Sequence, residues 1–142
     1  MCDADEMSID DGPPARLASI CLDCAEGQAD TMATFYERLL GYERHATDGR
    51  GWRQLRDPRG GPSLNIQEEP WYEPPIWPER PGEPMKMMHF ELRVDDVDLT
   101  MESVVAGGGC EASPQPPDRD PQRLRVILDP AGHPSCLFVA GE

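Results

Sequence analysis

His89 and Glu91 are the residues whose types and spacing point most directly to chemistry. They stand two positions apart in the run 89–96, which reads as a strand, so their side chains share one face. A carboxylate beside an imidazole raises the basicity of the ring and suits general acid–base catalysis. The alternative interpretation is an internal salt-bridge network, Glu91–Arg93 or Asp23–Arg93, that only shapes a cleft.

The cysteines offer a second kind of chemistry. Cys21 and Cys24 form a C-x-x-C pattern, which is typical of redox and zinc sites. They fall within the strand-like run 17–24, where residues three apart point to opposite faces, so we expect the two thiols not to share a ligand. Cys136 is a candidate nucleophile beside His89, weighed against the plainer interpretation of a small core residue.

Composition limits the classes of partner. The 142 residues include 27 Asp and Glu against 13 Lys and Arg, a net charge of −14. This charge disfavours binding to nucleic acid or to an anionic membrane surface. No apolar run reaches the roughly 20 residues of a membrane helix, and no signal peptide is recognisable. We therefore expect no nucleic-acid or membrane partner, reduced thiols and a cytoplasmic location.

The first half of the chain contains a regular succession of elements. After an acidic leader over 1–15, which we expect to be disordered, the pattern predicts a strand at 17–24. An amphipathic helix follows, starting at Asp30 or Thr31 and stopped by Gly41. Further strands are expected at 42–46, 52–56 and 63–67.

The second half repeats this order. The run 89–96 parallels 19–26, a second helix is expected from about Asp96 to Ala106, and the turn 57–60 (Asp-Pro-Arg-Gly) returns as 129–132 (Asp-Pro-Ala-Gly). In such a turn Pro presets φ, Asp accepts a backbone N–H and Gly tolerates positive φ. Order, spacing and turn chemistry together predict a duplicated unit.

The duplicated unit, with its helix ending 35–42 and closing turn 129–134, resembles the glyoxalase/bleomycin-resistance/extradiol-dioxygenase superfamily, whose fold is the vicinal oxygen chelate fold. The resemblance is greatest to short glyoxalase-like domain proteins of actinobacteria. It implies an α+β fold in which two tandem βαβββ modules form a curled mixed sheet around a cleft, with helices on the outside. The implied boundaries are one domain over 16–142, with modules at about 17–68 and 87–140 joined by a connection over 69–86.

The resemblance also implies where a metal would bind. In metal-using members the ligands come from the first and last strands of each module, positions that fall here on Ser19, Leu64, His89 and Cys136. His89 is a usual ligand, and Cys136 suits a soft metal as thiolate. Leu64 has no donor atom and Ser19 is a poor ligand, so these positions do not supply the three or four ligands of a zinc or iron site. We therefore expect no cofactor, and any divalent metal is expected on His89 with Cys136.

Strand parity gives a list of cleft residues. If Ser19 and His89 face the cleft, then so do the alternate residues that follow them in the two strands. The residues of the opposite parity face the helices, and they are Ile20, Leu22, Cys24, Phe90, Leu92 and Val94. Gln67 reaches the cleft only if its strand carries a bulge. The Pro-rich segment 68–86 holds three aromatic residues that are expected either as a lid and cleft wall or as core covering. The predicted ligand-binding residues are Ser19, Cys21, Asp23, Gln67, Trp71, Tyr72, Trp77, Arg93 and Cys136.

Three functions remain open from the sequence. The first is a metal-independent binder of a small organic molecule in the cleft between the modules, with the aromatic residues as its wall. The second is an enzyme of lyase, isomerase or dioxygenase type that uses His89 and Glu91, with or without a divalent metal. The third is a non-catalytic module that forms a homodimer.

Overall fold

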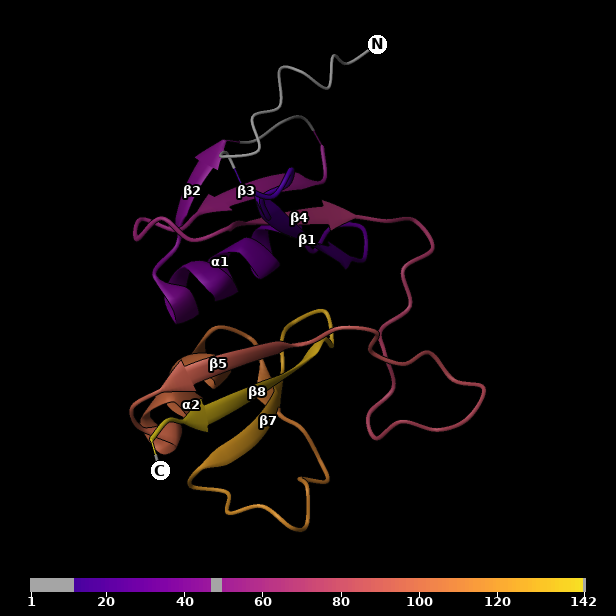
Figure 1. Ribbon diagram of the computed structural model, residues 1–142. Coiled ribbons are helices and arrows are strands. Elements are labelled where there is room, and N and C mark those ends of the chain that lie inside the picture. The colour runs from indigo at the N-terminus through magenta and orange to yellow at the C-terminus, as the bar shows by residue number, and fades with distance from the viewer. Residues whose placement is uncertain (1–11, 47–49, 142) are drawn as a thin grey trace.

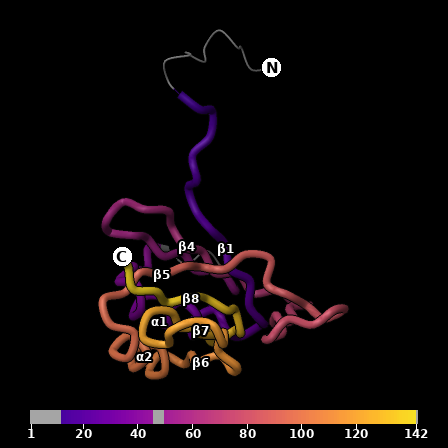
Figure 2. The backbone as a smooth tube through the Cα atoms, turned by 60° about the horizontal axis from the view of Figure 1, so that its bottom comes forward, coloured from indigo at the N-terminus to yellow at the C-terminus, as the bar shows by residue number. Residues whose placement is uncertain are grey.

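The computed structural model describes residues 12–46 and 50–141. The first eleven residues of the expected leader lie outside the described residues, and residues 12–18 extend away from the body of the chain (Figure 2). Figure 1 shows two modules, one above the other, joined at one side by the connector 69–86. The first module contains β1 (Ser19–Cys24), α1 (Ala29–Leu40), β2 (Glu43–Ala46), β3 (Trp52–Arg56) and β4 (Ser63–Glu68). The second contains β5 (Phe90–Val94), α2 (Val97–Ala106), β6 (Cys110–Glu111), β7 (Leu124–Leu128) and β8 (Pro134–Val139).

The two modules have the same strand topology. One sheet has the order β1-β4-β3-β2 and the other β5-β8-β7-β6, each with one parallel pair followed by antiparallel pairs. The predicted α+β class and tandem βαβββ modules are confirmed. The strands form two four-stranded sheets rather than one, and β1 and β5 are each an edge strand. Ile20, Leu40, Tyr42 and Phe90 line the space between these edges.

The predicted strand parity is confirmed. Cys21 and Asp23 on β1 are exposed, as are Glu91 and Arg93 on β5, while the alternate residues of both strands pack against the core. Cys24 is fully buried, so the two thiols of the C-x-x-C pattern point to opposite faces, as expected. Each sheet therefore has one apolar face toward the helices and one more polar face turned away from them.

One apolar core joins the two modules. Met32, Phe35 and Tyr36 lie at helical spacing on α1 and are almost completely buried. The rings of Phe35 and Tyr36 meet edge to face at 4.9 Å, and Tyr36 meets Phe90 of β5 at 6.0 Å between ring centroids. In Figure 1, α1 lies between its own sheet and β5. The core thus couples a helix of the first module to a strand of the second.

The helix ends follow the sequence signals in part. Gly41 ends α1 with φ 71°, as predicted, and Asp96 caps α2 by accepting the Leu99 N–H at 3.0 Å. The predicted start of α1 at Asp30 or Thr31 is wrong, because the N-cap is Gln28. Asp30 instead pairs with Arg53 at 2.7 Å on the helix surface. Among the described residues, no helix has the length and apolar character needed to cross a bilayer.

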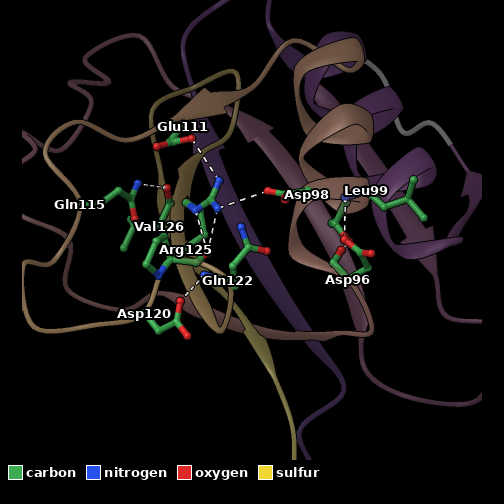
Figure 3. A network of polar contacts seen from close by, with 11 residues as sticks. Asp96, Asp98, Leu99, Glu111, Gln115, Asp120, Gln122, Arg125 and Val126 are labelled. Atoms are coloured by element: carbon green, nitrogen blue, oxygen red, sulfur yellow. Dashed lines mark hydrogen bonds and ion pairs between the residues drawn. The ribbon is translucent and has the colours of Figure 1, made fainter.

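A buried arginine fixes the loop 112–123 beside β7 (Figure 3). Arg125 is 8% exposed and donates two hydrogen bonds to the Pro121 carbonyl at 2.8 and 3.0 Å. Its guanidinium also pairs with Glu111 at 3.2 Å and with Asp98 of α2 at 3.4 Å. Gln115 accepts a hydrogen bond from the Val126 N–H at 2.8 Å. These contacts hold both ends of the loop against the second sheet.

Candidate functional site

The face of the second sheet that is turned away from the helices is hollowed. Two adjoining hollows of about 460 and 310 Å³ lie over β5, β7 and β8, and we call them together the trough. The loop 112–123 and the connector residues Trp77 and Lys86 form its walls. Each of the two hollows has a volume within the range of small-molecule sites, roughly 300–1,000 Å³.

Strand register gives the trough an apolar floor. Leu124 pairs with Phe138 and Val126 pairs with Cys136 across β7 and β8, so these four side chains share one face. Glu91 pairs with Cys136 across β5 and β8 and joins the same face. The floor is thus mainly apolar, with a carboxylate at its β5 side.

Trp77 forms a fixed aromatic wall. Its indole N–H donates to the Pro114 carbonyl at 2.8 Å, which ties the connector to the loop 112–123. The Lys86 ammonium lies 5.5 Å from the ring centroid and pairs with Glu79 at 2.7 Å. The ring is therefore held in place before any ligand binds.

Burial makes Cys136 a poor nucleophile. Burial raises the pKa of its thiol, and the negative charge of Glu91 raises it further, against the lowering effect of Lys86 and Arg119. Because the thiolate is the form that attacks electrophiles and binds soft metals, a raised pKa favours the inert thiol at neutral pH.

His89 and Glu91 lie together at the trough, as the sequence placed them. Both line the smaller hollow with Cys136. Arg93 lies farther along β5, at a separate hollow beside the end of α1. Among the described residues, neither Glu91 nor Asp23 forms an ion pair with Arg93. The salt-bridge alternative therefore has no support in this geometry, while the acid–base role stays a prediction.

The other predicted ligand-binding strand residues lie on the first sheet. Ser19, Cys21 and Asp23 are on β1, and none of them lines the trough. Gln67 pairs with Asp23, and its Oε1 lies 3.9 Å from the Cys21 sulfur. The expectation that Gln67 needs a bulge to share this face is wrong, because the register of β1 and β4 is continuous.

The last-strand position of the first module belongs to Asn65 rather than to Leu64. Asn65 pairs with Cys21 in the way that Cys136 pairs with Glu91, whereas Leu64 is buried in the core. The sequence comparison failed because the face residue follows the Asp-Pro-x-Gly turn one position later in the first module. A one-residue shift exchanges the two faces of a strand.

These side chains do not fit a divalent metal centre. Ser19 and Asn65 offer only neutral oxygen donors at these positions, and the raised pKa of Cys136 disfavours the thiolate ligand. In the part of the chain that the structure describes, no group of three or more His, Cys, Asp or Glu side chains is placed to hold a metal ion. No step of the proposals below uses a metal.

The three connector aromatics have different surroundings. Trp77 lines the trough, as a cleft wall would. Trp71 is 90% exposed and lies over no hollow of the second sheet. The Tyr72 hydroxyl donates to the Ala131 carbonyl at 2.8 Å and lies 3.4 Å from His133, so this ring covers the core between the modules.

Sequence reasoning missed several trough residues. Lys86, Arg119, Leu124, Val126 and Phe138 all line the trough. The alternation of Leu124 and Val126 is a readable strand signal for the floor. Arg119 belongs to an irregular loop, and no periodic pattern gives its position.

Comparison with known proteins agrees with this architecture. The family model described as a glyoxalase-like domain matches residues 19–138. No curated protein matches the chain. Similar solved structures include a glyoxalase/bleomycin resistance/dioxygenase family enzyme from Burkholderia phytofirmans, with 15% identity, a TM-score of 0.62 and coverage of 88% of this chain and 98% of that one.

Two further structural neighbours have more specific descriptions. A fosfomycin resistance protein from Listeria monocytogenes has 15% identity, a TM-score of 0.60 and coverage of 89% of this chain and 94% of its own. An antibiotic-binding protein from a Streptomyces species has 20% identity, a TM-score of 0.53 and coverage of 89% and 98%. At these identities the likeness concerns the fold alone. The match of the family model over most of the sequence shows that this chain belongs to the glyoxalase-like domain family.

Proposed function

We propose that the chain binds a small organic molecule in the trough, without a resident metal ion. The observation that carries the proposal is the combination of an apolar floor, a fixed indole wall and a few charged groups at one hollow. Such a site supplies apolar contact area and polar orientation together. We place the ligand here rather than between the modules, where the hollow beside Ile20 and Phe90 measures only about 220 Å³.

The structural neighbours support a small organic ligand. The Streptomyces neighbour is described as an antibiotic-binding protein, and the Listeria neighbour as a fosfomycin resistance protein. Each description applies to that protein, and the shared fold supports a comparable class of ligand here. A homodimeric state and a cytoplasmic location stay predictions from the sequence.

A second candidate function is catalysis at the same place. It rests on His89 and Glu91 lining one hollow, which suits proton transfer on a bound molecule. A bound compound that is chemically converted by the wild type but not by Glu91→Gln would favour this candidate. Unchanged recovery of every bound compound would contradict it.

A thermal-shift screen tests the proposed function. The protein is purified with a chelator and screened against small aromatic compounds at neutral pH. We expect at least one class of compound to raise the unfolding temperature, because a ligand at 100 times its Kd stabilises the folded state by about 2.7 kcal/mol. Affinity measured by calorimetry should be unchanged when zinc, nickel or ferrous iron is added. Binding that requires an added metal, or no binding in the whole panel, would contradict the proposal.

A further inference from the structure

Four residues line both hollows and therefore mark the centre of the trough. They are Glu91, Arg119, Leu124 and Cys136. A molecule that spans the trough must pass over all four. Their chemistry is an acid and a guanidinium beside an aliphatic side chain and a thiol, so the central contacts combine opposite charges with apolar surface.

The two central charges have no partner within the described residues. Neither Glu91 nor Arg119 forms a hydrogen bond or an ion pair there, with each other or with another group. Lys86, which also lines the trough, is in contrast already paired, because its ammonium lies 2.7 Å from the Glu79 carboxylate. Both central charges line the same two hollows as the Cys136 thiol. Consistent with this placement, Glu91 raises the pKa of that thiol and Arg119 lowers it.

The charge of the trough differs from that of the whole chain. The sequence carries 27 acidic and 13 basic residues. The trough, in contrast, is lined by the acids Glu91, Asp118 and Asp120 and by the bases Lys86, Arg119 and Arg123. Such a balanced lining does not select for a simple cation, as the acidic surface as a whole would.

We propose that the ligand of the trough is a zwitterion with a flat apolar body. Its anionic group faces Arg119, whose planar guanidinium suits a carboxylate, and its protonated amine faces Glu91. The apolar body lies on Leu124 and against the Trp77 ring. This inference rests on the proposed function and adds the chemical class of the ligand.

A charge series tests the class of ligand. For phenyl and indolyl rings, the acid, the amine, the amino acid and the neutral amide are titrated into the protein by calorimetry at low salt. We expect the amino acid to bind most tightly. Arg119→Gln should weaken the acid and the amino acid by about fivefold while sparing the amine, and Glu91→Gln should do the converse. Arg38→Gln and Glu102→Gln, on exposed helix residues outside the trough, are matched controls and should change nothing.

The outcomes separate this inference from the proposed function. A preference for the amino acid, together with the selective fivefold weakening by each trough variant, supports both. Equal binding of all charge forms, or uniform weakening by either variant, overturns the zwitterion and leaves the binding site standing. If no member of either series binds while the thermal-shift screen finds ligands of another charge class, the zwitterion is again wrong. Failure of both screens overturns the proposed function as well.

Discussion

Replacing Phe35 by alanine is expected to lower the free energy of unfolding by about 3–5 kcal/mol. The ring is 1% exposed and meets Tyr36 edge to face. It also fills a space left by two glycines of the second module, because a Cβ at Gly107 or Gly109 would lie 3.1 or 2.7 Å from its ring atoms. The alanine variant leaves this space empty on the boundary between the modules.

Urea denaturation followed by circular dichroism and tryptophan fluorescence measures this loss. Because Phe35 belongs to the core shared by both modules, the two signals should change together in one transition. Leu99→Ala is the control, since Leu99 is 64% exposed on α2 and its removal should change stability by less than about 0.5 kcal/mol. A loss below about 1 kcal/mol for Phe35→Ala, or two separate transitions in the wild type, would contradict a shared core.

Replacing Asp129 by alanine is expected to cost about 3 kcal/mol. Asp129 is 4% exposed and accepts three hydrogen bonds, from the Tyr36 hydroxyl at 2.7 Å and from the backbone N–H groups of Ala131 and His133 at 2.9 and 3.0 Å. Alanine leaves these buried donors without an acceptor. Asparagine keeps an acceptor for the N–H groups and a donor for the tyrosine oxygen, so Asp129→Asn should cost much less.

The duplication supplies a matched control for Asp129. Its counterpart Asp57 accepts the N–H groups of Arg59 and Gly61 at 2.9 and 3.1 Å in the equivalent turn. Residues 58–61 of that turn are exposed, so water can replace the lost acceptor. Asp57→Ala should therefore be clearly less destabilising than Asp129→Ala. Equal losses in chemical denaturation would show that the contact with Tyr36 and its burial contribute nothing.

The Asp129 carboxyl is also expected to make the free energy of unfolding depend on pH. Burial raises its pKa above the ordinary 3.8, and His133 and the hydrogen bond from Tyr36 oppose this effect. The folded state then binds the proton more tightly than the unfolded state, so this group stabilises most at low pH. The stability of the wild type relative to Asp129→Asn should fall as pH rises from 3.8 to the raised pKa and stay constant above it. A difference that grows with pH would contradict the raised value.

Local patterns predicted much of this fold because each has a local physical cause. The alternation in β1 reflects a strand with one buried face, and Gly41 ends α1 because the terminal residue needs positive φ. The repeated Asp-Pro-x-Gly turns marked the duplication, since the same backbone geometry requires the same residues. These features needed no knowledge of distant contacts.

The trough was only partly predictable because it depends on long-range contacts. Parity placed His89 and Glu91 on one face, the family resemblance added Cys136, and composition singled out the aromatic residues of the connector, Trp77 among them. The loop 112–123 has no periodic pattern, and two of the contacts that position it, Trp77 with Pro114 and Arg125 with Asp98, connect residues far apart in sequence. The separation of Trp71 from Trp77 likewise follows from how the connector packs. Local sequence therefore predicts neither the position of the loop nor the separation of the two tryptophans.

A pair of tryptophan variants tests the binding account most directly. Calorimetry with the tightest compound of the screen compares Trp77→Ala, which removes the trough wall, with Trp71→Ala, which removes an indole that is 90% exposed. We predict that Trp77→Ala weakens binding by about tenfold or more, as the loss of an aromatic contact of about 1.4 kcal/mol implies, and that Trp71→Ala leaves it unchanged. Equal affinities of Trp77→Ala and the wild type, with both variants folded, would contradict the trough as the ligand site.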